Sequence, residues 1–131
     1  MDKRIKQYLF LLLAILQSTS VHPAEQVTGF TVKPDRCIAL NQGQLCYQHL
    51  DLEWQTEDGE QYCLYQQNLA EPVVCWSGRE KSSYQLEFVS DTNIIYQIRV
   101  EGQRDVLSQV EVEVAWVYRS TRKSFSRWRL F

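Results

Sequence analysis

Apolar and polar residues alternate along most of this chain, and the apolar ones do not recur at helical spacing. The clearest case lies near the end, where Val110, Val112 and Val114 alternate with Glu111 and Glu113. A period of two places one row of side chains on a core and the other in water, as in a β-strand. The pattern therefore predicts strands rather than helices.

Similar runs recur at near-regular spacing, separated by turn residues such as Asp58-Gly59. The expected strands are 30–33, 37–40, 44–54, 61–65, 73–76, 84–88, 94–100 and 110–118. Seven to eight short strands with no intervening helix predict an all-β fold, an antiparallel β-sandwich of immunoglobulin-like topology. A closed barrel is the alternative, because period-2 patterns do not separate the two.

Two aromatic-rich runs, 61–65 and 73–76, each contain one cysteine. Antiparallel pairing about Asn68-Leu69-Ala70 sets Cys63 directly opposite Cys75. We therefore expect a hairpin closed by a disulfide. The same register places Tyr62 against Trp76, which we expect to pack on the core, and Tyr65 against Val73.

The same counting sets Cys37 across from Cys46 about the turn Asn41-Gln42. Each bridge would close a loop of roughly ten residues and stabilise the fold by about 2–3 kcal/mol. The gaps between successive cysteines are 9, 17 and 12 residues, unlike the close ligand pairs of zinc sites. We expect two structural disulfides, no metal and no cofactor. Since no cysteine follows Cys75, we expect local bridges rather than one joining an early to a late strand.

The N-terminus has the composition of a secretory signal peptide. Lys3, Arg4 and Lys6 precede an apolar run over 8–16, and small and polar residues follow to residue 24. That run of about nine residues is far shorter than the roughly 20 needed to span a bilayer. We expect a signal helix within residues 1–24, a single domain over residues 25–131, and no membrane span after cleavage.

Two candidate catalytic groups are weak. His49 shares the outward face of one expected strand with Asp51 and Glu53, where a solvated surface explains all three. Ser120 and Lys123 match Ser-x-x-Lys, but they follow a strand instead of starting a helix. We expect no enzyme; a small hydrolase using His49 or Ser120 is one alternative.

Charge divides the chain unevenly. Residues 25–118 contain 6 basic and 15 acidic residues, whereas the tail, residues 119–131, contains five basic residues and no acid. Such asymmetry indicates a docking segment, in which arginines grip carboxylate or phosphate and aromatic residues anchor. The predicted partner-binding residues are Arg119, Arg122, Lys123, Arg127, Trp128, Arg129 and Phe131. The partner would be an envelope protein or anionic outer-membrane lipid, and not nucleic acid; alternatively, the tail folds back on its own acidic body.

An ordered set of short motifs resembles a family of small exported proteins of Gram-negative gammaproteobacteria, classed as a domain of unknown function. The set comprises Val32-Lys33-Pro34, Gln44-Leu45-Cys46, Trp54, Cys63-Leu64-Tyr65, Cys75-Trp76, Trp116-Val117-Tyr118 and the ending Arg127-Trp128-Arg129-Leu130-Phe131. The resemblance covers nearly all of residues 25–131. It implies a periplasmic location and no established activity.

Together these features predict a non-catalytic periplasmic binding or accessory protein, in envelope homeostasis or signalling. An inhibitor of an enzyme such as a lysozyme is another alternative. In that case a protruding loop such as Gly78–Ser83 would plug the enzyme's cleft.

Overall fold

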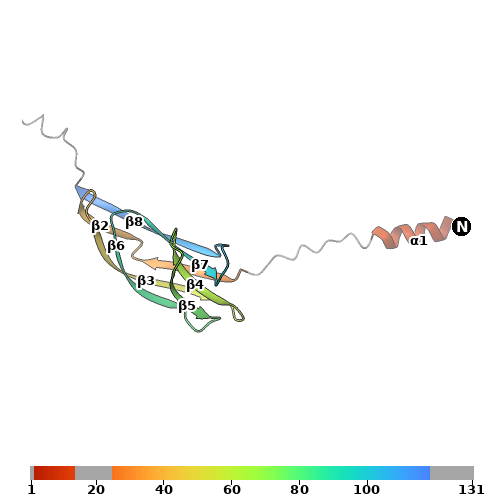
Figure 1. Cartoon of the computed structure of the whole chain (residues 1–131). Coiled ribbons are helices and arrows are strands. Elements are labelled where there is room, and N and C mark those ends of the chain that lie inside the picture. The colour runs from red at the N-terminus through yellow and green to blue at the C-terminus, as the bar shows by residue number, and fades with distance from the viewer. Residues whose placement is uncertain (1, 14–24, 119–131) are drawn as a thin grey trace, which may run out of the picture.

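The alternating segments form eight β-strands in a computed structural model that describes residues 2–13 and 25–118 (Figure 1). In chain order the elements are α1 (Asp2–Leu13), β1 (Val27–Lys33), β2 (Arg36–Asn41), β3 (Cys46–Thr56), β4 (Gln61–Gln66), β5 (Pro72–Ser77), β6 (Ser83–Ser90), β7 (Ile94–Val100) and β8 (Ser108–Tyr118). The predicted all-β class is confirmed.

The strands form two sheets. The three-stranded sheet has the order β1-β3-β6, and the five-stranded sheet has the order β2-β8-β7-β4-β5. Neighbouring strands are antiparallel, except that β2 runs parallel to β8. The chain passes from one sheet to the other at Pro34, because proline has no N–H to continue the ladder of β1. Two separate sheets make the immunoglobulin-like sandwich that the sequence predicts, and not a closed barrel.

Aromatic side chains from both sheets fill the core. Trp54 of β3 is 1% exposed and stacks on Trp76 of β5, with ring centroids 4.5 Å apart. Tyr62 lies opposite Trp76 in the β4–β5 ladder, as predicted, with centroids 6.1 Å apart. The Trp54 indole donates to the Lys81 carbonyl at 2.9 Å, and the Trp76 indole donates to Thr56 Oγ1 at 3.1 Å. The prediction that Trp76 packs on the core is confirmed, and both buried indoles have hydrogen-bond partners.

The first disulfide closes the β4–β5 hairpin. Cys63 and Cys75 are directly opposite, with an S–S distance of 2.03 Å. The predicted pairing of Tyr65 with Val73 is wrong, because Tyr65 faces Pro72 beyond an irregularity in the register. A β-bulge of this kind inserts one extra residue in one strand, and here the register leaves Val73 as the extra residue.

The second disulfide, between Cys37 and Cys46, has the predicted connectivity but not the predicted setting. Cys37 lies in β2 beside Val114 of β8, whereas Cys46 lies in β3 beside Ser90 of β6. These strands belong to different sheets, so the bridge joins the two layers instead of closing a hairpin. The expected hairpin about Asn41-Gln42 is therefore wrong, although the bridge is local in sequence and does not join an early strand to a late one.

No cysteine of the described chain is free. Disulfides form and persist in oxidising compartments, so the structure indicates an exported protein. Helix α1 has 12 residues, and within the two described ranges no helix is long and apolar enough to cross a membrane. The cleavage site near residue 24 lies outside the described residues and stays a prediction.

Candidate functional site

His49 lies on the outer face of the three-stranded sheet between two carboxylates. Its Nδ1 is 2.6 Å from Glu87 Oε1, and its Nε2 is 3.9 Å from Asp51 Oδ1. The hydrogen bond with Glu87 raises the pKa of His49 above its usual value of 6.5. All three side chains are at least half exposed, so the group is a solvated ion-pair cluster. Both ring nitrogens of His49 thus face carboxylates, one within hydrogen-bond distance and one beyond it.

Most of the other site residues predicted from the sequence lie outside residues 2–13 and 25–118, which the structure describes. Ser120 and the predicted partner-binding residues of the tail (Arg119, Arg122, Lys123, Arg127, Trp128, Arg129 and Phe131) lie outside the described residues. The loop Gly78–Ser83 is described, and hydrogen bonds tie it to neighbouring strands. The Gly78 N–H donates to the Glu60 carbonyl at 2.8 Å, and the Ser82 carbonyl accepts from the Trp54 N–H at 2.9 Å. The loop is therefore anchored to the sandwich at both ends.

A cleft of about 430 Å³ lies beside this loop. Its walls come from the start of the domain, the end of β3 and the segment after β5, and they include Glu25, Glu57, Arg79 and Lys81. Two charges of each sign line the cleft, so its walls favour neither an anion nor a cation.

The outer face of the five-stranded sheet has a different polar cluster, centred on Arg99 of β7. The Arg99 guanidinium carbon lies 4.4 Å from the centre of the Tyr65 ring of β4. Arg99 Nη2 donates to Gln97 Oε1 at 2.7 Å, and Gln97 Nε2 donates to Gln109 Oε1 of β8 at 3.4 Å. Although these side chains face outward, Tyr65 is only 8% and Gln97 only 6% exposed. We call these four residues the Arg99 cluster.

Within the Arg99 cluster the positive charge has neutral partners only. Arg99 is half-buried, and its Nε has no hydrogen-bond partner. Two of the other five Lys and Arg residues of 25–118 pair with acids: Arg36 with Glu113 at 3.2 Å, and Arg79 with Asp58 at 3.7 Å. No Asp or Glu oxygen of residues 25–118 lies within 4.0 Å of the Arg99 guanidinium.

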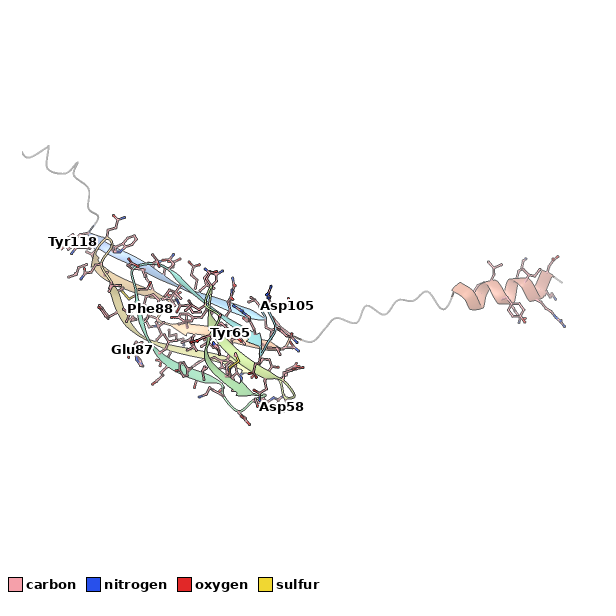
Figure 2. All side chains as sticks on the ribbon, in the orientation of Figure 1. Asp58, Tyr65, Glu87, Phe88, Asp105 and Tyr118 are labelled. Atoms are coloured by element: carbon pink, nitrogen blue, oxygen red, sulfur yellow. A yellow bond between two sulfur atoms is a disulfide. The ribbon has the colours of Figure 1, made fainter. Side chains whose placement is uncertain are left out.

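Large apolar side chains are exposed where β2 and β8 run side by side toward the end of the described chain. Ile38, Leu40, Val117 and Tyr118 are 65%, 60%, 58% and 63% exposed. The parallel register places Ile38 beside Ala115 and, two residues on, Leu40 beside Val117. Ile38, Leu40 and Val117 lie on the outer face of the five-stranded sheet, whereas Tyr118, in register with Asn41, lies on the other face of β8 with Val112 and Val114. We call Ile38, Leu40 and Val117 the apolar strip. Figure 2 shows Tyr118 at one end of the sandwich, opposite Asp58 and Asp105.

Sequence reasoning missed three features of these surfaces: the Glu87 partner of His49, the Arg99 cluster and the apolar strip. Alternation alone could have found part of the strip, because Ile38 and Leu40 alternate with the core residues Cys37 and Ala39. The partners of His49 and Arg99 come from other strands, which alternation does not identify.

The comparisons with known proteins add a family. Residues 30–130 match the family described as Protein of unknown function (DUF3019). No curated protein and no solved structure matches the chain significantly. Since the match covers most of the sequence, the chain belongs to this family, in agreement with the resemblance in its cysteine and tryptophan motifs.

Proposed function

We propose that this DUF3019 protein is a non-catalytic periplasmic binding protein of the cell envelope, and that its partner docks on the apolar strip. The observation that carries the proposal is the strip itself. Three large apolar side chains, each more than half exposed, lie together on one face of two neighbouring strands. Contiguous exposed apolar surface is typical of protein-interaction sites.

The position of the strip in the chain supports the same proposal. Val117 and Tyr118 immediately precede the basic tail, which brings five positive charges and the aromatic residues Phe125, Trp128 and Phe131. An apolar surface continuous in sequence with a basic, aromatic segment suits a partner that has an apolar centre and an acidic rim. We therefore favour an envelope protein over lipid as the partner, acting in envelope homeostasis or signalling.

Site-specific photo-crosslinking in living cells tests this proposal. A benzoylphenylalanine at position 38 should give a covalent adduct of discrete mass, identifiable by mass spectrometry. The matched control position is Gln85, an exposed residue on the outer face of the other sheet. Adducts at both positions, or at neither, would overturn the strip as the docking surface.

Two further variants distinguish the contribution of the apolar strip to partner binding from that of the tail. Leu40→Asp should abolish the adduct at position 38 without unfolding the protein, because Leu40 is exposed. Replacing the five basic tail residues by serine should weaken the adduct in proportion to the share of binding that the tail supplies. A lipopolysaccharide ladder instead of a discrete protein band would show that the partner is lipid.

A further inference from the structure

The Arg99 cluster is an incomplete ion pair. Its guanidinium is half-buried, and burial removes part of the hydration that stabilises a charge in water. The domain has 15 acidic residues against 6 basic ones, so acids are plentiful. Glu101 lies only two residues further on, in the turn after β7, yet no ion pair forms between it and Arg99. The missing component is an anion.

The neighbours of Arg99 orient its side chain. The Tyr65 ring lies under the guanidinium, and Gln97 accepts one of its N–H groups, so the side chain is held before any ligand arrives. A preorganised arginine loses little conformational entropy when it binds. Gln109 is exposed beside it, so the cluster opens to solvent on the outer face of the sheet.

We propose that the Arg99 cluster binds the carboxylate of an acidic sugar. A planar guanidinium matches a carboxylate through two parallel hydrogen bonds. A single positive charge balances one carboxylate, whereas the more highly charged phosphates are usually met by several cations. The side-chain amide of Gln109 on β8, which belongs to the cluster, can both donate and accept hydrogen bonds, which suits sugar hydroxyls.

This site is distinct from the apolar strip, because it lies on β4, β7 and the start of β8, while the strip lies on β2 and the end of β8. In Figure 2, Tyr65 of the cluster lies well away from Tyr118, the neighbour of Val117 in β8. Partner docking on the apolar strip and sugar binding by the Arg99 cluster can therefore be tested independently.

A nuclear magnetic resonance titration of the oxidised protein tests the site. Glucuronate should shift the Arg99 Nε–H signal and the amide signals of Gln97 and Gln109, because the ligand changes the field at the guanidinium. Glucose, the matched neutral sugar, should shift none of them. No response to glucuronate, or an equal response to glucose, would overturn the proposal.

Two variants that each remove one positive charge test whether glucuronate binds at Arg99. Arg99→Gln should weaken glucuronate binding at least about tenfold, since it removes charge-assisted hydrogen bonds. Arg36→Gln removes the same charge from an exposed position of the same sheet, so it should leave binding unchanged. Equal losses of glucuronate binding in both variants would show only non-specific electrostatic attraction and would contradict the proposed site.

Two further ligands test the chemical class. Acetate should bind more weakly than glucuronate, because it offers a carboxylate without hydroxyls. If N-acetylalanine, the carboxylate of a peptide end, binds more tightly than glucuronate, the assignment to a sugar is wrong.

Discussion

The charged clusters around His49 and Arg99, on opposite outer faces of this sandwich, are paired in different ways. On the three-stranded sheet, His49 lies between Glu87 and Asp51, and all three side chains remain in solvent. On the five-stranded sheet, Arg99 is half-buried on Tyr65 and has no acid among the described residues within ion-pairing distance. The charges around His49 are thus paired with one another, while the charge of Arg99 has neutral partners only.

The comparison shows that charged residues alone do not mark a site. The cluster around His49 contains more ionisable groups, including one with a raised pKa, yet solvent screens it and its charges are paired. The Arg99 cluster contains one charge, but partial burial makes that charge costly without a counter-ion. Incomplete pairing is thus the more informative signal here.

The largest expected effect comes from the core that lies beneath both faces. Trp54→Ala should lower the free energy of unfolding by about 3–5 kcal/mol, because it removes a fully buried ring stacked on Trp76. Denaturant unfolding measures the loss. Tyr47→Ala, on the same strand but 70% exposed, is the control and should change stability by less than about 0.5 kcal/mol. Similar losses in both variants would contradict the core assignment.

Removing each disulfide should have a smaller effect on stability and should show which bridge supports the Arg99 cluster. Replacing Cys63 and Cys75 together by alanine should lower the free energy of unfolding by about 2–3 kcal/mol, because the open chain regains loop entropy. Since Cys63 lies opposite Arg99 in the β4–β7 ladder, this variant should also shift the Arg99 Nε–H signal.

The other disulfide is the control. Replacing Cys37 and Cys46 by alanine should cost a similar free energy, about 2–3 kcal/mol, since its loop is of similar length. It should leave the Arg99 signal in place, because that bridge joins β2 to β3. A shift of the Arg99 signal in both double variants would mean that the face responds to general loosening.

The smallest expected effect is the pH dependence of the His49 cluster. The folded protein favours the protonated imidazole, because Glu87 raises the pKa of His49. The resulting stabilisation is fully present below the unfolded pKa of about 6.5 and is lost as pH rises through the higher folded value. Melting temperatures of the wild type and His49→Gln should therefore converge between about pH 6 and 8.

Glu87→Gln sharpens this test. It removes the main cause of the shift, so the pKa of His49, followed by nuclear magnetic resonance, should fall back toward its usual value. Asp51→Asn should lower it less, because Asp51 lies 3.9 Å away and acts only through its charge. The reverse order would show that the same-strand partner, and not the cross-strand one, controls His49.

Local pattern in the sequence predicts much of this fold. Alternation placed the strands and assigned Leu50, Leu52 and Trp54 to the buried side of β3, where each is at most 1% exposed. Counting residues about one turn also placed Cys63 opposite Cys75. These features depend on neighbours within one strand or one hairpin, so the spacing of residues along the chain is enough to predict them.

Features that join distant segments were not predictable in the same way. Alternation tells on which side of its own strand a residue lies, but it does not say which strand comes next to it. For that reason the parallel pairing of β2 with β8 turned an expected hairpin bridge into a link between sheets. Glu87 meets His49 across 38 residues of sequence, and Arg99 meets Tyr65, only because the strands are ordered as they are. Long-range packing, which no local period encodes, brought together the residues from which both surface proposals are built.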